Sequence, residues 1–167
     1  MRLTSFAAAA VLASPALAAP ALANSGTVTV EIPQASVRTY RKPFVAVWIE
    51  NAAGDNVRTV QVLHDQARIA RRWLPDLRSW WRQGGNAMSM PADGISSPTR
   101  APGQHRFALT GLERLTPGNY SVVVEAAREN GGRELVKVPF RLQRGRAANA
   151  SASGSREVGQ VSVAIRP

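Results

Sequence analysis

Residues 43–63 read PFVAVWIENAAGDNVRTVQVL, and this stretch decides the fold. Residues 43–50 are apolar on both faces, which predicts a central strand between two packed layers. A short polar turn containing Asn, Gly and Asp follows. Residues 57–63 then return as a second strand, with Val60 and Val62 predicted to share one face. Two strands joined by such a turn predict an antiparallel hairpin.

Five other stretches carry the alternating or apolar patterns that predict strands. They are residues 27–32, 105–109, 120–127, 135–142 and 158–165. About seven short strands separated by turn signals are typical of a sandwich. The sequence therefore predicts a mostly β protein, an immunoglobulin-like antiparallel β-sandwich with one short helical insertion.

The helical insertion is predicted over residues 65–85. Pro75 suits the first position of a helix. Leu77, Trp80 and Trp81 follow at spacings of three and four, so they form one apolar stripe along that helix. Gly84 and Gly85 are expected to end it. We therefore expect a short amphipathic helix packed against the sandwich.

Two connecting segments stand out by their composition. Residues 86–103 are predicted to form a long loop, and loops of this length in compact domains are often functional. Residues 144–156 are rich in Ala, Ser, Gly and Asn. This composition predicts a flexible hairpin tip between the last two strands.

The first 23 residues predict export. Arg2 precedes an Ala-rich apolar run, and an Ala-x-Ala site ends at Ala23, which is the arrangement of a secretory signal peptide. A second such site ends at Ala18. The run is shorter than the roughly 20 apolar residues that span a bilayer, and no later stretch qualifies. We expect one Ig-like domain, residues 24–167, in the periplasm, with no membrane span after signal cleavage.

Charge and cysteine content narrow the function classes. The chain has no cysteine, which excludes thiol catalysis and cysteine-ligated metal sites. Its net charge is +10, from 21 Lys+Arg against 11 Asp+Glu, and such a surface attracts phosphates, anionic headgroups or acidic partners. We expect no nucleic-acid partner for an exported protein. A genome with biased base composition also produces an excess of arginine, so charge alone does not establish a binding role.

The densest cluster of recognition side chains lies in the insertion. Guanidinium groups pair with phosphates and carboxylates, and indole rings stack on flat ligands. The cluster consists of Arg71, Arg72, Arg78, Trp80, Trp81 and Arg82. One hypothesis is that it binds a partner, such as a flavin, a haem or a lipid surface. The alternative is that the tryptophans cap an open edge of the sandwich and the arginines form its solvated rim.

No catalytic residue and no metal site is predicted. The G-x-S-x-G motif of acyl hydrolases is absent, and His64 and His105 are not at ligand spacing. Three aspartates form no recognisable pair: Asp65, Asp76 and Asp93. Met88 and Met90 could bind Cu(I) through their thioethers. The alternative is that both methionines pack on the sandwich.

Two stretches resemble the Ig-like domain of flagellar hook-capping proteins. The first is the hairpin quoted above, where GDNVRTV resembles a recurring G-x-x-V-R-T-L pattern. The second is LTPGNYSVVVEAAR, residues 115–128, which resembles a P-x-G-x-Y corner. Gly118 is expected to permit a tight turn there, and Tyr120 to anchor the corner through its hydroxyl group.

A second resemblance covers about residues 27–167. RWLPDLRSWWR, residues 72–82, and PTRAPG, residues 98–103, make the chain similar to a family of predicted periplasmic proteins, domain of unknown function 2271. Members of that family are often encoded beside PepSY-type membrane proteins and a periplasmic flavin transferase. The resemblance therefore implies one of these as a partner, and an accessory role in membrane redox or iron handling.

The resemblance also implies one candidate cofactor residue. Periplasmic flavin transferases attach FMN through a phosphoester to the threonine of an S/T-G-A-T-like motif, and Thr99 is the matching position here. Ser97 and Pro98 stand where the motif has Gly and Ala. The sequence thus favours a non-enzymatic periplasmic binding or accessory protein without a cofactor. The alternative is a flavin-carrying redox protein modified at Thr99.

Overall fold

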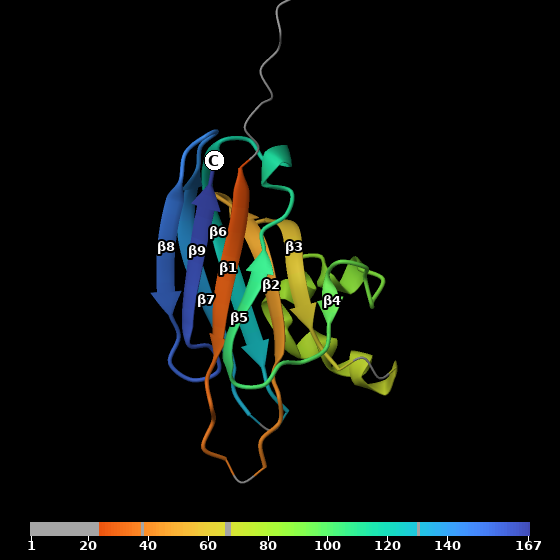
Figure 1. Ribbon diagram of the computed structural model, residues 1–167. Helices are drawn as coiled ribbons and strands as arrows, with labels where there is room; N and C mark the ends of the chain where they lie inside the picture. The colour runs from red at the N-terminus through yellow and green to blue at the C-terminus, as the bar shows by residue number, and fades with distance from the viewer. Residues whose placement is uncertain (1–23, 38, 66–67, 130) are drawn as a thin grey trace, which may run out of the picture.

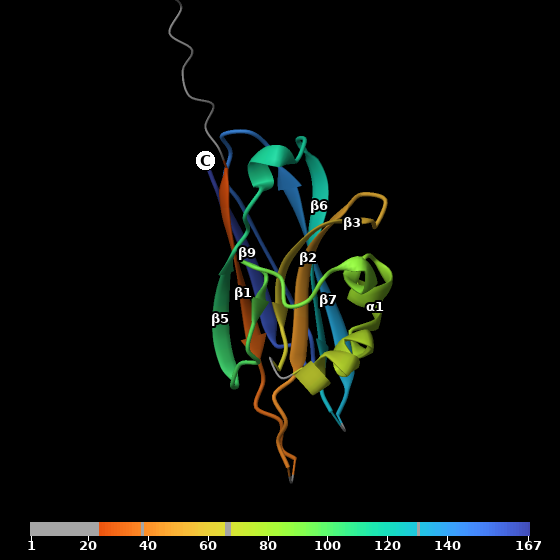
Figure 2. The ribbon, with the colours of Figure 1, turned by 90° about the vertical axis from the view of Figure 1, so that its right-hand side faces the viewer.

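The computed structural model describes residues 24–37, 39–65, 68–129 and 131–167. Two β-sheets pack face to face, and a helical segment covers the outer face of one of them (Figures 1 and 2). The expected signal peptide, residues 1–23, lies outside the described residues, so its cleavage stays a prediction.

The first sheet has the strand order β5-β1-β9-β8, and the second has the order β4-β3-β2-β6-β7. The strands are β1 (Ser25–Ile32), β2 (Phe44–Asn51), β3 (Asn56–Leu63), β4 (Ser96–Ser97), β5 (Gly103–Ala108), β6 (Gly118–Ala127), β7 (Arg133–Leu142), β8 (Ala148–Ser153) and β9 (Gln160–Arg166). The predicted mostly β sandwich is confirmed. It is antiparallel except at β3 and β4, which run parallel. The insertion between these two strands turns the chain back, and parallel neighbours need such a long crossover.

Strand β2 lies inside the second sheet and contributes to two clusters. Val45, Val47 and Ile49 pack in the inner core, which lies between the two sheets, while Ala46 and Trp48 face the helical insertion. All five are at most 1% exposed. The cluster under the insertion, here called the outer core, consists of Ala46, Trp48, Val62, Leu74, Leu77, Trp80, Val123 and Ala127. The predicted central strand between two packed layers is therefore confirmed.

Strand β3 departs from the prediction at Val60 and Val62. The register of the β2–β3 pair shifts between Val47 and Trp48, which leaves Val60 as an extra residue in a β-bulge. Val60 therefore turns to the inner core, while Val62 faces the outer core. The prediction that both valines share a face is wrong, because one inserted residue reverses the alternation of side chains.

The helical insertion consists of short helices. It comprises η1 (Arg68–Asp76), α1 (Arg78–Arg82) and η2 (Gly85–Ala87); η3 (Leu112–Arg114) follows β5. Leu74 in η1, Leu77 between η1 and α1, and Trp80 in α1 are all buried in the outer core. The prediction that the helix begins at Pro75 is wrong, because Pro75 lies within η1 and α1 begins at Arg78.

Residues 144–156, predicted as a flexible hairpin tip, contain strand β8 instead. β8 pairs with β9, and its alanines at 148, 150 and 152 pack against the inner core. The turn after β8 is held by Glu134 on β7, whose carboxylate accepts the backbone N–H groups of residues 155–158 at 2.8–3.0 Å. Burial raises the pKa of Glu134, but these N–H groups lower it by more than burial raises it, so the pKa falls to about 2. The segment is therefore a paired edge strand followed by a pinned turn.

The expected tyrosine corner is present. Tyr120 donates its hydroxyl proton to the carbonyl oxygen of Thr116 at 2.8 Å, and its ring stacks on Phe140 with centroids 6.0 Å apart. Gly118 is not what permits the turn. Its φ is not among the positive ones, and a Cβ there would have its nearest neighbour at 3.6 Å, which is ordinary contact.

Candidate functional site

The buried carboxylate of Glu125 attaches the helical insertion to the second sheet. Glu125 lies on β6 and is 0% exposed. It accepts the backbone N–H groups of Ser79 and Trp80 at 3.0 and 2.9 Å and pairs with Arg133 on β7 at 3.0 Å. The first N–H groups of a helix lack partners within the helix and favour an anion. Glu125 therefore determines where α1 sits on the sheet.

A second buried carboxylate, Glu50 on β2, holds the end of the insertion. It accepts hydrogen bonds from Trp48 Nε1 and Gln83 Nε2, both at 3.1 Å, and forms an ion pair with Lys137 on β7. Glu50 is 2% exposed. The two glutamates thus fix both ends of α1, and the surface that the insertion presents is rigidly mounted.

The outer side of the insertion carries a shallow hollow of about 390 Å³, here called the arginine groove. It is lined by Pro75, Arg78, Trp81, Arg82 and Arg133. Arg78 and Arg82 are exposed and Trp81 is half-buried. Guanidinium groups pair bidentately with carboxylates and phosphates, so the groove can receive an anionic group.

The structure divides the predicted Arg and Trp cluster into two sets. Arg78, Trp81 and Arg82 meet in the arginine groove. Trp80 cannot contact a partner, because it is 0% exposed and donates from Nε1 to Thr59 at 3.1 Å. A partner-binding role for Trp80 is therefore wrong, and its role is to fill the outer core.

The two arginines of η1 lie apart from that groove. Arg71 donates to the carbonyl oxygen of Met90 at 2.6 Å and so ties η1 to the loop after η2. Arg72 is exposed, with its guanidinium 4.9 Å from the centroid of the Trp73 ring. Arg133, which was not predicted from the sequence, lines the groove because its guanidinium pairs with Glu125 and lies within 3.4 Å of Ser79 Oγ in α1.

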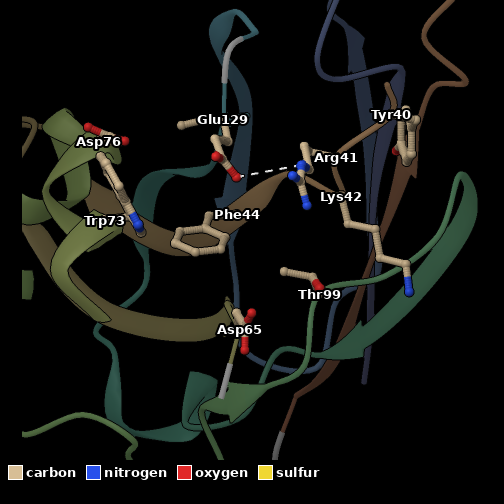
Figure 3. A pocket seen from close by; sticks show the side chains of 10 residues that line it. Tyr40, Arg41, Lys42, Phe44, Asp65, Trp73, Asp76, Thr99 and Glu129 are labelled. Atoms are coloured by element: carbon tan, nitrogen blue, oxygen red, sulfur yellow. Dashed lines mark ion pairs between the residues drawn. The ribbon is translucent and has the colours of Figure 1, made fainter. Parts of the chain in front are cut away.

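A second hollow, here called the end cavity, lies where β2 begins (Figure 3). Its volume is about 420 Å³, within the range of roughly 300–1,000 Å³ typical of small-molecule sites. It is lined by Tyr40, Arg41, Lys42, Phe44, Asp65, Trp73, Asp76, Thr99, Ala127 and Glu129. A hollow of about 580 Å³ over β2, β6 and β7 is larger but more open.

The end cavity combines aromatic rings with charges of both signs. Trp73 is 44% exposed, and Phe44 packs against the outer core. Arg41 and Glu129 form an exposed ion pair at 3.8 Å. Thr99, the one cofactor-binding residue predicted from the sequence, lies in this wall. The cavity therefore offers flat apolar surfaces beside polar groups.

Tyr40 carries a polar atom that the described residues leave unsatisfied. Its Oη is buried and has no hydrogen-bond partner among residues 24–37, 39–65, 68–129 and 131–167. Burial raises the pKa of Tyr40, against the lowering effect of the Arg128 charge. Arg128 lies 5.8 Å from the Tyr40 ring centroid and pairs with Glu157 at 2.8 Å. The ring is thus held beside Arg128, and its hydroxyl group is buried without a partner among the described residues.

The histidines and methionines have structural roles. His64 is 0% exposed and donates from Nδ1 to the carbonyl oxygen of Asp65 at 2.7 Å. His105 Nε2 donates to the carbonyl oxygen of Ala101 at 2.7 Å. Met88 and Met90 pack against the outer core. In the part of the chain that the structure describes, no three His, Asp or Glu side chains cluster as metal ligands.

The two anchoring glutamates were not predicted from the sequence. Each interrupts an apolar strand, Glu50 after FVAVWI and Glu125 within VVVEAA. A carboxylate in such a run needs a partner to be buried, and that rule could have marked both. That rule could not have predicted which residues are the partners, because these lie in the insertion and on β7.

The comparisons with known proteins give one match. A family model described as "Predicted periplasmic protein (DUF2271)" matches residues 25–160. No curated protein and no solved structure matches the chain. Among the described segments, no helix has the length and apolar character that a bilayer crossing requires.

Proposed function

The chain belongs to the family of predicted periplasmic proteins, domain of unknown function 2271, and from this premise we propose that it is a non-enzymatic binding module that docks onto a membrane-bound partner. That partner, of PepSY type or a periplasmic flavin transferase, belongs to a redox or iron-handling system. The observation that carries the proposal is the arginine groove, where three guanidinium groups surround a half-buried tryptophan.

The groove has the features of a weak, charge-guided docking surface. Arg133 is oriented by buried Glu125, and Arg82 donates from Nε to the carbonyl oxygen of Arg78 at 3.2 Å. Both contacts limit side-chain freedom, which lowers the entropy lost on binding. The chain as a whole is also basic, with a net charge of +10, and complementary charge speeds association with an acidic partner.

Replacing Arg78 and Arg82 together with glutamine is expected to weaken docking without destabilising the fold. Exposed side chains contribute within about 0.5 kcal/mol to stability, so the urea melt should stay unchanged. Recovery of the partner from membrane extract at low salt should fall about fivefold, since each exposed charge contributes up to about 1 kcal/mol. Raised salt should produce the same loss in the wild type because of screening.

The matched control is Arg106→Gln with Arg166→Gln, which removes the same charge from exposed positions of the first sheet. This control should recover the partner as the wild type does. Equal, salt-insensitive recovery from all three proteins would remove the docking role and leave the groove as a solvated rim.

The alternative, a flavin phosphoester at Thr99, meets a stiff backbone. Thr99 lines a cavity that has aromatic rings and charges of both signs, but Pro98 precedes it and fixes the backbone that a transferase must grip. The segment is also pinned, since His64 donates its backbone N–H to the carbonyl oxygen of Ser97 at 3.0 Å. The backbone at Thr99 therefore does not favour attachment of the group.

Protein co-expressed with a periplasmic flavin transferase is therefore expected to be colourless, with the intact mass of the unmodified mature chain. Mass spectrometry and a visible absorption spectrum check this. A yellow protein, heavier by one FMN and unmodified in the Thr99→Ala variant, would replace the binding module with a redox carrier.

A further inference from the structure

We propose that the end cavity binds a small zwitterion with an apolar or aromatic body, a class that includes the aromatic amino acids. This ligand goes beyond the docking function, because the end cavity and the arginine groove share no lining residue. Three features of the cavity support the proposal: its rings, its paired charges and an unsatisfied hydroxyl group.

The rings provide the apolar contact surface. Trp73 is 44% exposed, so its ring offers a large flat apolar surface to a ligand. One neighbour of its ring is the Arg72 guanidinium at 4.9 Å. In Figure 3, Trp73 and Phe44 stand side by side in the wall of the cavity. A flat or branched apolar body can lie against both rings.

The charges lie on different sides of these rings. Figure 3 shows Asp76 beside Trp73, and Arg41 and Lys42 on the far side of Phe44. Three carboxylates line the cavity, at Asp65, Asp76 and Glu129, in a chain with only 11 acidic residues against 21 basic ones. A ligand charge that leaves water needs an opposite charge nearby. Glu129 is paired with Arg41, so Asp76 beside Trp73 is the carboxylate for a ligand ammonium group, and Arg41 and Lys42 are the cations for a ligand carboxylate.

The basic side has unused binding capacity. The ion pair of Arg41 and Glu129 is long, at 3.8 Å, and the two side chains are 59% and 56% exposed, so it holds Arg41 only weakly. Tyr40 lies on the same side in Figure 3, and its buried Oη has no partner in the described part of the chain. A buried hydroxyl group is normally satisfied. A ligand carboxylate beside Arg41 would accept from its guanidinium group, and it would accept from Tyr40 Oη once that ring turns its hydroxyl group into the cavity.

The cavity is held open by contacts that need no ligand. The ion pair of Arg128 and Glu157, whose side chains are 9% and 6% exposed, supports Tyr40 from behind. On the opposite wall, the strand pairing of Ser97 with Leu63 fixes the approach to Thr99. A preformed site loses less conformational freedom on binding. The cavity therefore suits a free small molecule.

Calorimetric titration at neutral pH with three matched probes tests the proposal. L-Phenylalanine carries both charges, 2-phenylethylamine only the ammonium group and 3-phenylpropanoate only the carboxylate. Phenylalanine is expected to bind at least tenfold more tightly than either single-charge probe. Trp73→Ala should weaken phenylalanine binding at least tenfold, while Trp81→Ala, in the arginine groove, should leave it unchanged.

Two charge variants identify the sides of the cavity. Asp76→Asn should lower the affinity for phenylalanine to that for 3-phenylpropanoate. Arg41→Gln should lower it to the affinity for 2-phenylethylamine. A single-charge probe that binds as tightly as phenylalanine, or no binding of all three at millimolar concentration, would overturn the zwitterion site. Recovery of the membrane partner is measured separately, so this failure would leave the docking proposal standing.

Discussion

Replacing Glu125 with glutamine is expected to lower the free energy of unfolding by about 1.5–3 kcal/mol, the range for hydrogen bonds to a charged group. The carboxylate accepts two backbone N–H groups of α1 and pairs with Arg133. An amide offers one oxygen and places its own N–H₂ group against the remaining donors. An amide oxygen in the place of Oε2 would still accept from Ser79 and Trp80, but these hydrogen bonds would lose the negative charge, and the amide N–H₂ group would face the Arg133 guanidinium.

The loss should appear first in the insertion. Trp80 in α1 and Trp48 on β2 are both fully buried, so the tryptophan fluorescence of the chain should shift to the red and proteolysis should increase between residues 68 and 87, while the β-sheet circular dichroism persists. The matched control is Arg133→Gln, whose side chain is 34% exposed and which leaves both backbone hydrogen bonds to Glu125 in place. If both variants lose equal stability, the ion pair and not the helix attachment is what matters.

Replacing Glu134 with glutamine is expected to cost about 2–3 kcal/mol at pH 7 and to flatten the acid side of the stability curve. Burial raises the pKa of Glu134, but the four backbone N–H groups bring it to about 2, from its usual 4.5. A lowered folded-state pKa stabilises the fold above the unfolded-state pKa. In the wild type this contribution is complete above about pH 5 and is lost as the pH falls towards 2.

Urea melts of wild type and variant from pH 7 to pH 2 check this prediction. The two stability curves should converge as the pH falls, because protonated Glu134 resembles the neutral amide. Glu113→Gln, at an exposed position next to Arg114, is the control and should run parallel to the wild type. A constant gap between the wild type and Glu134→Gln at every pH would show that shape, and not charge, holds the turn.

The strands that were predicted correctly are those whose side chains carry a strong local pattern. β2 is apolar on both faces, so it could be assigned to two packed layers from its sequence alone. β8 could not, because ANASAS, residues 148–153, contains no large apolar residue and its order comes from β9 and from the turn that Glu134 holds. The bulge at Val60 was hidden too, since a bulge appears only in the register of two strands.

The candidate sites were predicted only in part for the same reason. The arginines at 78 and 82 are neighbours in sequence and were found, whereas Arg133 reaches the arginine groove through the pairing of β6 and β7. Asp65 and Asp76 were considered as candidates, but the sequence did not predict that they share a site. Only the fold places them with Thr99 in the end cavity. Residues that come together from three separate segments have no characteristic spacing in the sequence that could predict their contact.

The double-faced strand β2 also limits how far this domain can be reduced by protein engineering. A shortened version without residues 65–95 would uncover Ala46, Trp48 and Val123 on one flat sheet. An apolar sheet surface of that kind invites self-association. Anyone who wants a minimal scaffold from this chain would therefore have to redesign the uncovered faces of β2 and β6 as polar surface. The insertion cannot be removed from the sheet without such a redesign.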